Sequence, residues 1–182
     1  MEKKNIVIGV TGGIAVYKAL DVISRLNKLN YNTFVIMTKN AQNFVCPLSF
    51  ETLSKNPVVT DMFMNKKNWE VEHIALAKKA DLFLIVPATA NIIGKVVNGI
   101  ADDMLSTTIM ATKAPIVFAP AMNENMYQNI ILQANIEKLK SYGYKFIDPA
   151  EGMLACGDIG IGKLAKVDTI VNYVKNIMSR SE

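Results

Sequence analysis

Four short apolar runs, each followed by small or polar residues, constrain the fold of this chain more than any other feature. The runs cover residues 5–11, 32–38, 81–87 and 114–118. Short and almost continuously apolar runs are typical of strands buried on both faces of a parallel sheet. A helix-like spacing of apolar residues follows, most clearly over residues 14–26. The sequence therefore predicts an α/β fold, a doubly wound, Rossmann-like or flavodoxin-like parallel sheet with helices on both faces.

Length, composition and charge limit the organisation and the partners. The chain has 182 residues, of which 51% are hydrophobic and 20% charged, which predicts one compact domain over residues 1–182. The lysines are scattered rather than gathered in a patch, so no nucleic-acid partner is expected. No apolar run approaches the roughly 20 residues of a membrane-spanning helix, and the charged start resembles no signal peptide. We therefore expect a cytoplasmic protein without a membrane partner.

The first two runs end in residues suited to a phosphate. Gly12 and Gly13 separate a predicted strand from a predicted helix, so a ligand can approach the backbone and meet the free N–H groups of the helix start. The glycines do not follow the G-x-G-x-x-G pattern, so a dinucleotide is not indicated. Thr38-Lys39-Asn40, at the end of the second run, offers a hydroxyl, a cation and an amide. In both places the alternative is a turn without a ligand.

The third and fourth runs end in small residues and amides. Thr89 and Asn91 can form hydrogen bonds, and the alanines beside them leave room for a flat ring. Residues 118–127 place Asn123 and Asn125 at the end of the fourth run, although a plain strand-to-helix turn has the same composition. Because the carboxyl ends of parallel strands meet at one edge of a sheet, the four endings together predict a site for a planar, phosphate-bearing ligand.

Two reactive side chains lie outside these endings. His73, the only histidine, falls in the first turn of a predicted helix over residues 71–80, where it is either a proton acceptor or a surface or capping residue. Cys156 lies in the glycine-rich segment 152–163. That segment is predicted to be a flap that closes over a ligand or a glycine-rich hairpin with a passive thiol.

The other polar and thiol residues are expected to be structural. Asp102 and Asp103 are predicted to cap a helix rather than to catalyse. Cys46, beside Phe44 and Val45, is expected to be buried. One histidine and two distant cysteines cannot build a metal site, so no metal is expected.

In combination, the motifs resemble the homo-oligomeric flavin-containing cysteine decarboxylases. The resemblance implies a doubly wound fold that binds FMN in clefts between the subunits of a trimer, often assembled further. It covers nearly the whole chain. It rests on Gly-Val-Thr-Gly-Gly-Ile-Ala at 9–15, Val-Glu-His-Ile-Ala-Leu-Ala at 71–77, Pro-Ala-Thr-Ala-Asn at 87–91, Gly-Ile-Ala-Asp-Asp-Met-Leu-Ser-Thr at 99–107, Pro-Ala-Met-Asn-x-x-Met at 120–126 and Leu-Ala-Cys-Gly-Asp-x-Gly-x-Gly at 154–162.

The resemblance also assigns roles residue by residue. His73 resembles the active-site histidine, Asn123 the amide that grips the substrate carboxylate, and Cys156 the proton donor. The substrate clamp is matched by Met153, Leu154 and Ala155. The flavin site is matched by Gly12, Gly13, Ile14, Thr38, Lys39, Asn40, Thr89, Ala90, Asn91, Ile92, Ser106 and Ala121.

The chemistry implied by the resemblance starts from a cysteine carboxylate, which does not lose CO₂ readily without an electron sink. FMN oxidises the thiol-bearing carbon to a thioaldehyde, which acts as that sink, and decarboxylation leaves an ene-thiolate. Return of a hydride and a proton completes the reaction. Cys156 as the acid favours the branch of coenzyme A synthesis, which converts 4′-phosphopantothenoylcysteine, sometimes alongside a synthetase domain or protein.

The resemblance leaves two alternative functions open, and the sequence departs from the family pattern at two positions. Relatives that oxidatively decarboxylate a peptide's C-terminal cysteine lack the reductive step, and other relatives are flavin-binding regulatory subunits without catalysis. Tyr127 stands where many members have Trp, and both side chains are aromatic and amphipathic. Asn40 stands where a small hydroxyl residue is common, which weakens the prediction of its flavin contact.

Overall fold

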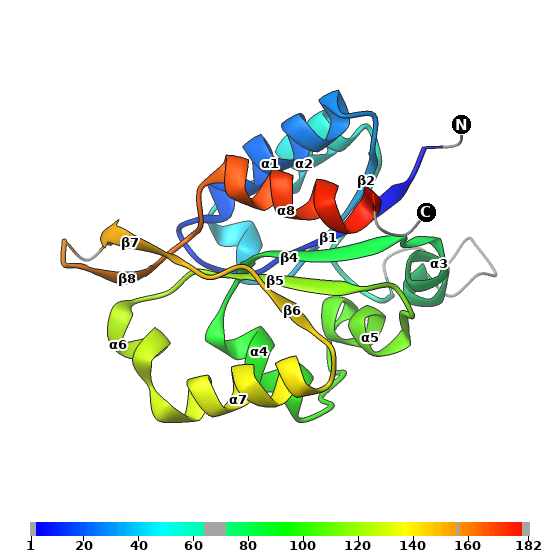
Figure 1. Ribbon diagram of the computed structural model, residues 1–182. Coiled ribbons are helices and arrows are strands. Elements are labelled where there is room, and N and C mark those ends of the chain that lie inside the picture. The colour runs from blue at the N-terminus through cyan, green and yellow to red at the C-terminus, as the bar shows by residue number, and fades with distance from the viewer. Residues whose placement is uncertain (1–2, 64–71, 156, 180–182) are drawn as a thin grey trace.

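The structure, a computed structural model, describes residues 3–63, 72–155 and 157–179 (Figure 1). Six of the described strands form one sheet in the order β3-β2-β1-β4-β5-β6, and every neighbouring pair is parallel. These strands are β1 (Asn5–Val10), β2 (Asn32–Met37), β3 (Val58–Val59), β4 (Leu82–Ala88), β5 (Ile116–Pro120) and β6 (Lys145–Phe146).

Helices cover both faces of this sheet. In Figure 1 one layer lies above the sheet and another lies below it. The upper layer contains α1 (Val16–Lys28), α2 (Pro47–Ser54) and α8 (Val167–Ser179), and the lower layer contains α4 (Ala90–Val97), α5 (Met104–Ala111) and α7 (Ile130–Ser141). Three further helices complete the described chain: the 3₁₀ helix η1 (Ala41–Asn43), α3 (Glu72–Lys79) and α6 (Glu124–Gln128).

Alternate residues of each central strand enter two separate cores. In β1, Ile6 and Ile8 pack with α1 and α8, whereas Val7 belongs to the core beneath the sheet. All seven residues of β4 are buried. A strand with both faces covered has no solvated side, which is why these segments are apolar at nearly every position.

A small antiparallel hairpin lies outside the sheet. It consists of β7 (Ala150–Met153) and β8 (Ile159–Lys163), and it projects from the edge of the sheet near α6 (Figure 1). Met122 N–H donates to the carbonyl of Gly162 at 2.9 Å. At Gly162 the backbone has a φ of +133°, and a Cβ there would lie 2.4 Å from the Met122 carbonyl oxygen. The hairpin therefore docks on the segment after β5 because this position has no side chain.

The α/β fold, the parallel sheet and its two helical layers confirm the prediction. The order 3-2-1-4-5-6 is the Rossmann order. The glycine-rich segment is a hairpin in its described part, one of the two predicted forms. The prediction for Cys46 was wrong, because its side chain is exposed. Cys46 precedes Pro47 in an extended conformation at the start of α2, and local apolar neighbours do not determine the direction of a side chain there.

Candidate functional site

The crevice of this sheet lies between β1 and β4. The chain leaves β1 toward α1 above the sheet and leaves β4 toward α4 below it (Figure 1). The two loops after these neighbouring strands therefore diverge and open a gap at the carboxyl edge. In open α/β sheets ligands bind at this switch point.

A buried hydroxyl group ties the two loops together. The Thr11 hydroxyl donates to the carbonyl of Pro87 at 2.7 Å and accepts from the Thr89 N–H at 3.0 Å. It also lies 3.2 Å from the Thr89 hydroxyl. Thr11 is only 2% exposed. The loop after β1 is thus fixed against the loop after β4 at the floor of the crevice.

Gly12 brings a third loop into the same place. A Cβ on Gly12 would lie 2.5 Å from Asn40 Cβ and 2.8 Å from the Asn40 carbonyl carbon, closer than real Cβ contacts allow. Only glycine lets the loop after β1 pass so close to the backbone after β2. The following helix, α1, has no side-chain cap and no acidic residue in its first turn, which leaves its positive end available to an anion.

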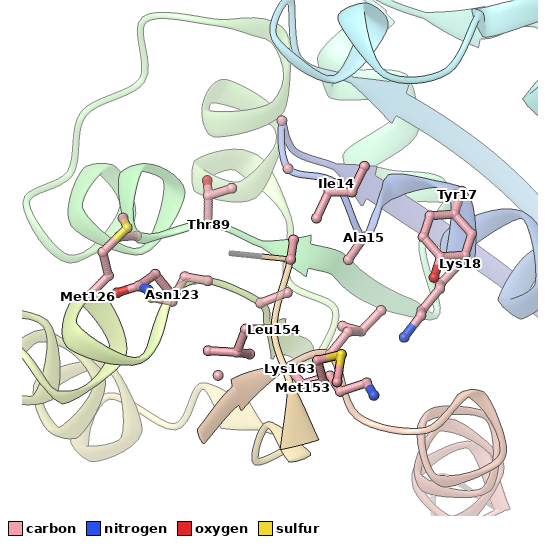
Figure 2. Close-up of a pocket in the computed structure, with 18 residues that line it drawn as sticks. Ile14, Ala15, Tyr17, Lys18, Thr89, Asn123, Met126, Met153, Leu154 and Lys163 are labelled. Carbon is pink, nitrogen blue, oxygen red and sulfur yellow. The ribbon is translucent and has the colours of Figure 1, made fainter. Parts of the chain in front are cut away.

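A first cavity opens on one side of this junction, with a volume of about 680 Å³. Its wall is mostly apolar, and Figure 2 shows Thr89, Asn123 and Met126 on one side of it and Tyr17 and Lys18 on the other. The lining residues are Gly12, Gly13, Ile14, Ala15, Tyr17, Lys18, Thr89, Ala90, Ala121, Met122, Asn123, Met126, Met153, Leu154, Ala155, Gly162, Lys163 and Leu164.

A second cavity of about 460 Å³ adjoins the first. The two share four lining residues, Gly12, Thr89, Ala90 and Met126, so they form two lobes of one crevice. The second lobe is richer in polar groups. Its lining residues are Thr11, Gly12, Thr38, Lys39, Asn40, Thr89, Ala90, Asn91, Ile92, Lys95, Asp103 and Met126.

The chemistry of the two lobes fits a flavin mononucleotide. The shared wall of glycine, alanine and methionine suits a flat ring. The second lobe offers the Thr38 hydroxyl, the Lys39 ammonium and the backbone around Gly12 to a phosphate. Because Gly12 has no side chain, its backbone can lie close to Asn40 and to a ligand in this part of the crevice.

An ion-paired cluster forms one wall of the second lobe. Lys95 Nζ lies 2.6 Å from Asp102 Oδ1 and 2.7 Å from Asp103 Oδ2. Asp103 also caps α5 in a reciprocal capping box with Ser106, which confirms its predicted capping role. The same prediction was wrong for Asp102, which precedes the N-cap and pairs with Lys95 instead. Burial alone would raise the pKa of Asp103, but hydrogen bonds from Lys95 and Ser106 outweigh it and hold the pKa below its usual value.

The crevice brings most of the predicted site residues together. In the first lobe lie Gly12, Gly13, Ile14, Ala121, Asn123, Met153, Leu154 and Ala155. In the second lie Thr38, Lys39, Asn40, Asn91 and Ile92, while Gly12, Thr89 and Ala90 belong to both. Asn123 caps α6, since its Oδ1 accepts from the Asn125 N–H at 2.9 Å.

Three predicted residues are not among the described lining of the crevice. Ser106 is fully buried, with its hydroxyl in the capping box of α5, and it lines neither lobe. Its flavin contact stays a prediction. His73 lies in the first turn of α3, as predicted, yet it also lines neither lobe. Cys156 lies outside the described residues.

Several lining residues were not predicted from the sequence. Thr11 is the last residue of an apolar run and could have been found from its position at the edge of the sheet. Lys18 and Lys163 reach the first lobe from α1 and β8, and Lys95 reaches the second from α4. No local pattern distinguishes these lysines from solvated ones, because only the docking of distant elements brings them to the crevice.

The described residues contain neither a metal-binding cluster nor a membrane-spanning helix. Across residues 3–63, 72–155 and 157–179, no group of three His, Cys, Asp or Glu side chains is placed to hold a metal ion. None of the helices in those ranges has both the length and the apolar character needed to cross a bilayer.

The protein is thus an α/β protein whose crevice, at the switch point of its sheet, has a shape and lining that suit a phosphate-bearing planar ligand. The sequence matches the family described as Flavoprotein over residues 1–179. The chain belongs to this family.

Relatives of the chain are similar along nearly its whole length. It is 49% identical over 181 residues to the coenzyme A biosynthesis bifunctional protein CoaBC of Borreliella burgdorferi, a match that covers 100% of this chain and 46% of the relative. The chain therefore spans about half the length of such bifunctional relatives. It is 45% identical over 174 residues to the probable phosphopantothenoylcysteine decarboxylase of Streptococcus mutans, covering 94% of this chain and 97% of that protein.

Solved structures share the fold. A PPC decarboxylase mutant complexed with pantothenoylaminoethenethiol superposes with a TM-score of 0.89 at 28% identity, covering 98% of this chain and 100% of the other. The FMN binding protein AtHal3 superposes with a TM-score of 0.86 at 28% identity, covering 98% of each chain.

Proposed function

We propose that this chain is an FMN-dependent decarboxylase that converts 4′-phosphopantothenoylcysteine to 4′-phosphopantetheine in coenzyme A synthesis. One observation carries the proposal: Asn123 and the hairpin residues Met153 to Ala155 line the same cavity as Gly12, Thr89 and Ala90. Residues expected to grip the substrate therefore lie against those expected to hold the flavin. The relatives named for this activity, one of them matched along 97% of its length, support it.

FMN is proposed to occupy both lobes. Thr38, Lys39 and the loop at Gly12 hold its phosphate, and Thr89 to Ile92 flank the ring and the ribityl chain. When bound, FMN supplies the oxidation of the thiol-bearing carbon of the substrate and the later return of the two electrons. The FMN-binding structural relative and the flavoprotein family support this choice of cofactor.

The protein's own side chains orient the substrate and move its protons. Asn123 is held at the N-terminus of α6, where its amide is proposed to bind the substrate carboxylate until CO₂ leaves. Met153 is 67% exposed and Leu154 is 9% exposed, so the end of β7 presents one open and one packed apolar side chain to the cavity. These residues are proposed to clamp the substrate and exclude water.

The proton balance requires an acid after CO₂ has left. The substrate loses two electrons and a proton from its thiol-bearing carbon, loses CO₂, and regains both electrons and two protons, so that the product differs from the substrate by CO₂ alone. Cys156 is proposed to supply the last proton to carbon, since a thiol is a competent acid near neutral pH.

His73 is proposed to act in a neighbouring subunit. It lines neither lobe of its own chain. The helix that carries it, α3, packs on α5, with the Thr112 hydroxyl bonded to the Ala77 carbonyl at 2.9 Å, and lies far from the β7–β8 hairpin (Figure 1). A homotrimer with its clefts between subunits would bring His73 of one copy to the crevice of the next.

The test is an absorbance spectrum of the purified protein, followed by mass spectrometry after addition of 4′-phosphopantothenoylcysteine. We expect a flavin spectrum and a product lighter by CO₂ alone. A product lighter by CO₂ and two further hydrogens would indicate an oxidative enzyme of the peptide-modifying kind. Flavin without any product would favour a regulatory subunit, and no flavin after reconstitution would overturn the proposal.

A further inference from the structure

The first lobe carries two cations at the end away from Asn123. Lys18 extends from the first turn of α1, and Lys163 is the last residue of β8. Both line the cavity, and in Figure 2 both lie on the side opposite Asn123. The described lining of this cavity contains no acidic side chain.

Neither ammonium group is neutralised within the described residues. Lys18 Nζ lies 5.9 Å from the centre of the Tyr17 ring, which orients it without removing its charge. Lys163 lies across the hairpin, with its Nζ 3.5 Å from the point where a Cβ of Gly152 would be. Within residues 3–63, 72–155 and 157–179, the ion pairs involve neither lysine.

The polar groups of this lobe thus lie at two ends of a largely apolar space. An amide lies at one end and two cations lie at the other, and Ile14, Ala15 and Leu154 lie between them. A volume of about 680 Å³ is in the usual range for sites of elongated small molecules, roughly 300–1,000 Å³. The matching ligand has an anion at each end and a mostly apolar chain between them.

We propose that Lys18 and Lys163 bind the 4′-phosphate of the substrate and so determine the preference for a phosphorylated substrate. The inference rests on the proposed function, in which Asn123 binds the carboxylate at the other end. A phosphate at this end of the lobe would make two charge-assisted contacts with the lysine ammonium groups. The flavin phosphate is assigned to the other lobe, beside Lys39.

The test compares 4′-phosphopantothenoylcysteine with unphosphorylated pantothenoylcysteine, using flavin-loaded enzyme. Lys18→Gln and Lys163→Gln are each expected to raise KM for the phosphorylated substrate about three- to tenfold, because a charge-assisted contact is removed. The double variant is expected to combine both losses. Kinetics with the unphosphorylated compound should not change, and Lys→Arg variants should restore most of the preference.

A matched control is Lys166→Gln, which removes the same charge from an exposed lysine that does not line the cavity. It should leave the preference intact. If the double variant retains the wild-type preference, the assignment is wrong. If it loses flavin, measured by absorbance, the lysines bind the phosphate of FMN instead, which also overturns the proposal.

A binding measurement tests the phosphate site independently of the proposed decarboxylation. If the wild type converts neither compound, the proposed decarboxylation fails, and calorimetry with 4′-phosphopantetheine and pantetheine still decides the role of the lysines. Tighter binding of the phosphorylated compound, lost in the double variant, supports the phosphate site. Equal binding of both compounds, or binding of neither, contradicts it.

Discussion

The hydroxyl of Thr11 accepts a hydrogen bond from the backbone N–H of Thr89 at 3.0 Å. This contact links the ends of β1 and β4, which are 78 residues apart in sequence. The same hydroxyl donates to the Pro87 carbonyl. One small side chain therefore sets the width of the crevice at the switch point, although it is not itself a predicted site residue.

Thr11→Val is expected to lower the free energy of unfolding by about 1–3 kcal/mol, because it leaves the buried Pro87 carbonyl and Thr89 N–H without their partner. It should also weaken flavin retention. Urea unfolding and the ratio of flavin to protein absorbance measure the two effects. Thr52→Val is the control, since the Thr52 hydroxyl is exposed on α2 and bonds only within its helix. Equal stability of the two variants would contradict the role of Thr11.

Gly12→Ala is expected to reduce flavin binding and to destabilise the protein by about 1–3 kcal/mol, because the new methyl group would collide with the backbone of Asn40. Gly94→Ala is a matched control. A Cβ at Gly94 meets nothing within 4 Å in the middle of α4, so this variant should gain about 0.5–1 kcal/mol from helix propensity. Thermal unfolding with and without added FMN distinguishes the two. A Gly12→Ala protein with wild-type flavin affinity would show that the close approach has no role in the site.

The ion pairs of Asp103 make part of the stability depend on pH. Its pKa is lower in the folded protein, so its contribution is present in full above the unfolded pKa of about 3.9 and is lost as the pH falls through the lower folded value. Asp103→Asn should remove about 1 kcal/mol at pH 7, since a carboxylate that is 34% exposed is partly screened. The stability of this variant should depend less on pH below 4, as measured by urea unfolding from pH 3 to 7.

Asp102→Asn serves as the control for that effect. Asp102 binds the same lysine but is 58% exposed, and it does not cap the helix. Its substitution should therefore change both stability and acid sensitivity less than Asp103→Asn. If the two variants behave alike, the capping box adds nothing to the ion pair.

Much of the fold could be predicted because each central strand is apolar on both faces, as in β4. The site could be located because loops after parallel strands meet at one edge, which brought Gly12 and Thr89 together as expected. Strand order could not be derived, since it depends on which helices pack together. The burial of Ser106 was missed although Asp103 three residues earlier is the pattern of a capping box.

Other features depend on distant contacts that a local pattern does not encode. Lys18 and Lys163 reach one cavity only because α1 and β8 meet there. Phe44 and Val45 suggested a buried Cys46, but the direction of the thiol is set by the start of α2. Likewise, the position of His73 in α3 could be predicted, whereas its distance from the crevice of its own chain could not.

Cys156→Ser is expected to decarboxylate the substrate but to stall at the oxidised ene-thiol, because serine is too weak an acid to protonate carbon. Mass spectrometry should then show a product lighter by CO₂ and two hydrogens. The hairpin and the flavin content should not change. Normal formation of 4′-phosphopantetheine by this variant would remove Cys156 as the acid.

His73→Asn is expected to retain flavin and to abolish CO₂ release. The proposed trimer adds a sharper expectation, because His73 and Asn123 would then serve one site from different chains. Asn123→Asp should also be inactive, since its carboxylate repels that of the substrate, while its oxygen still caps α6. Each variant alone should fold and bind flavin but form no product.

Hybrid oligomers of the His73→Asn and Asn123→Asp variants show whether each active site is built from one chain or from two. The two variants are unfolded, mixed in equal amounts and reassembled. If each site takes His73 from one chain and Asn123 from another, about one site in four receives both intact residues by chance. About a quarter of the wild-type activity should then return. If His73 and Asn123 of one chain formed a site, every site would keep one defect and no activity would return. The wild type treated in the same way gives the reference for reassembly. Because His73 lines neither lobe of its own crevice, we expect the activity to return.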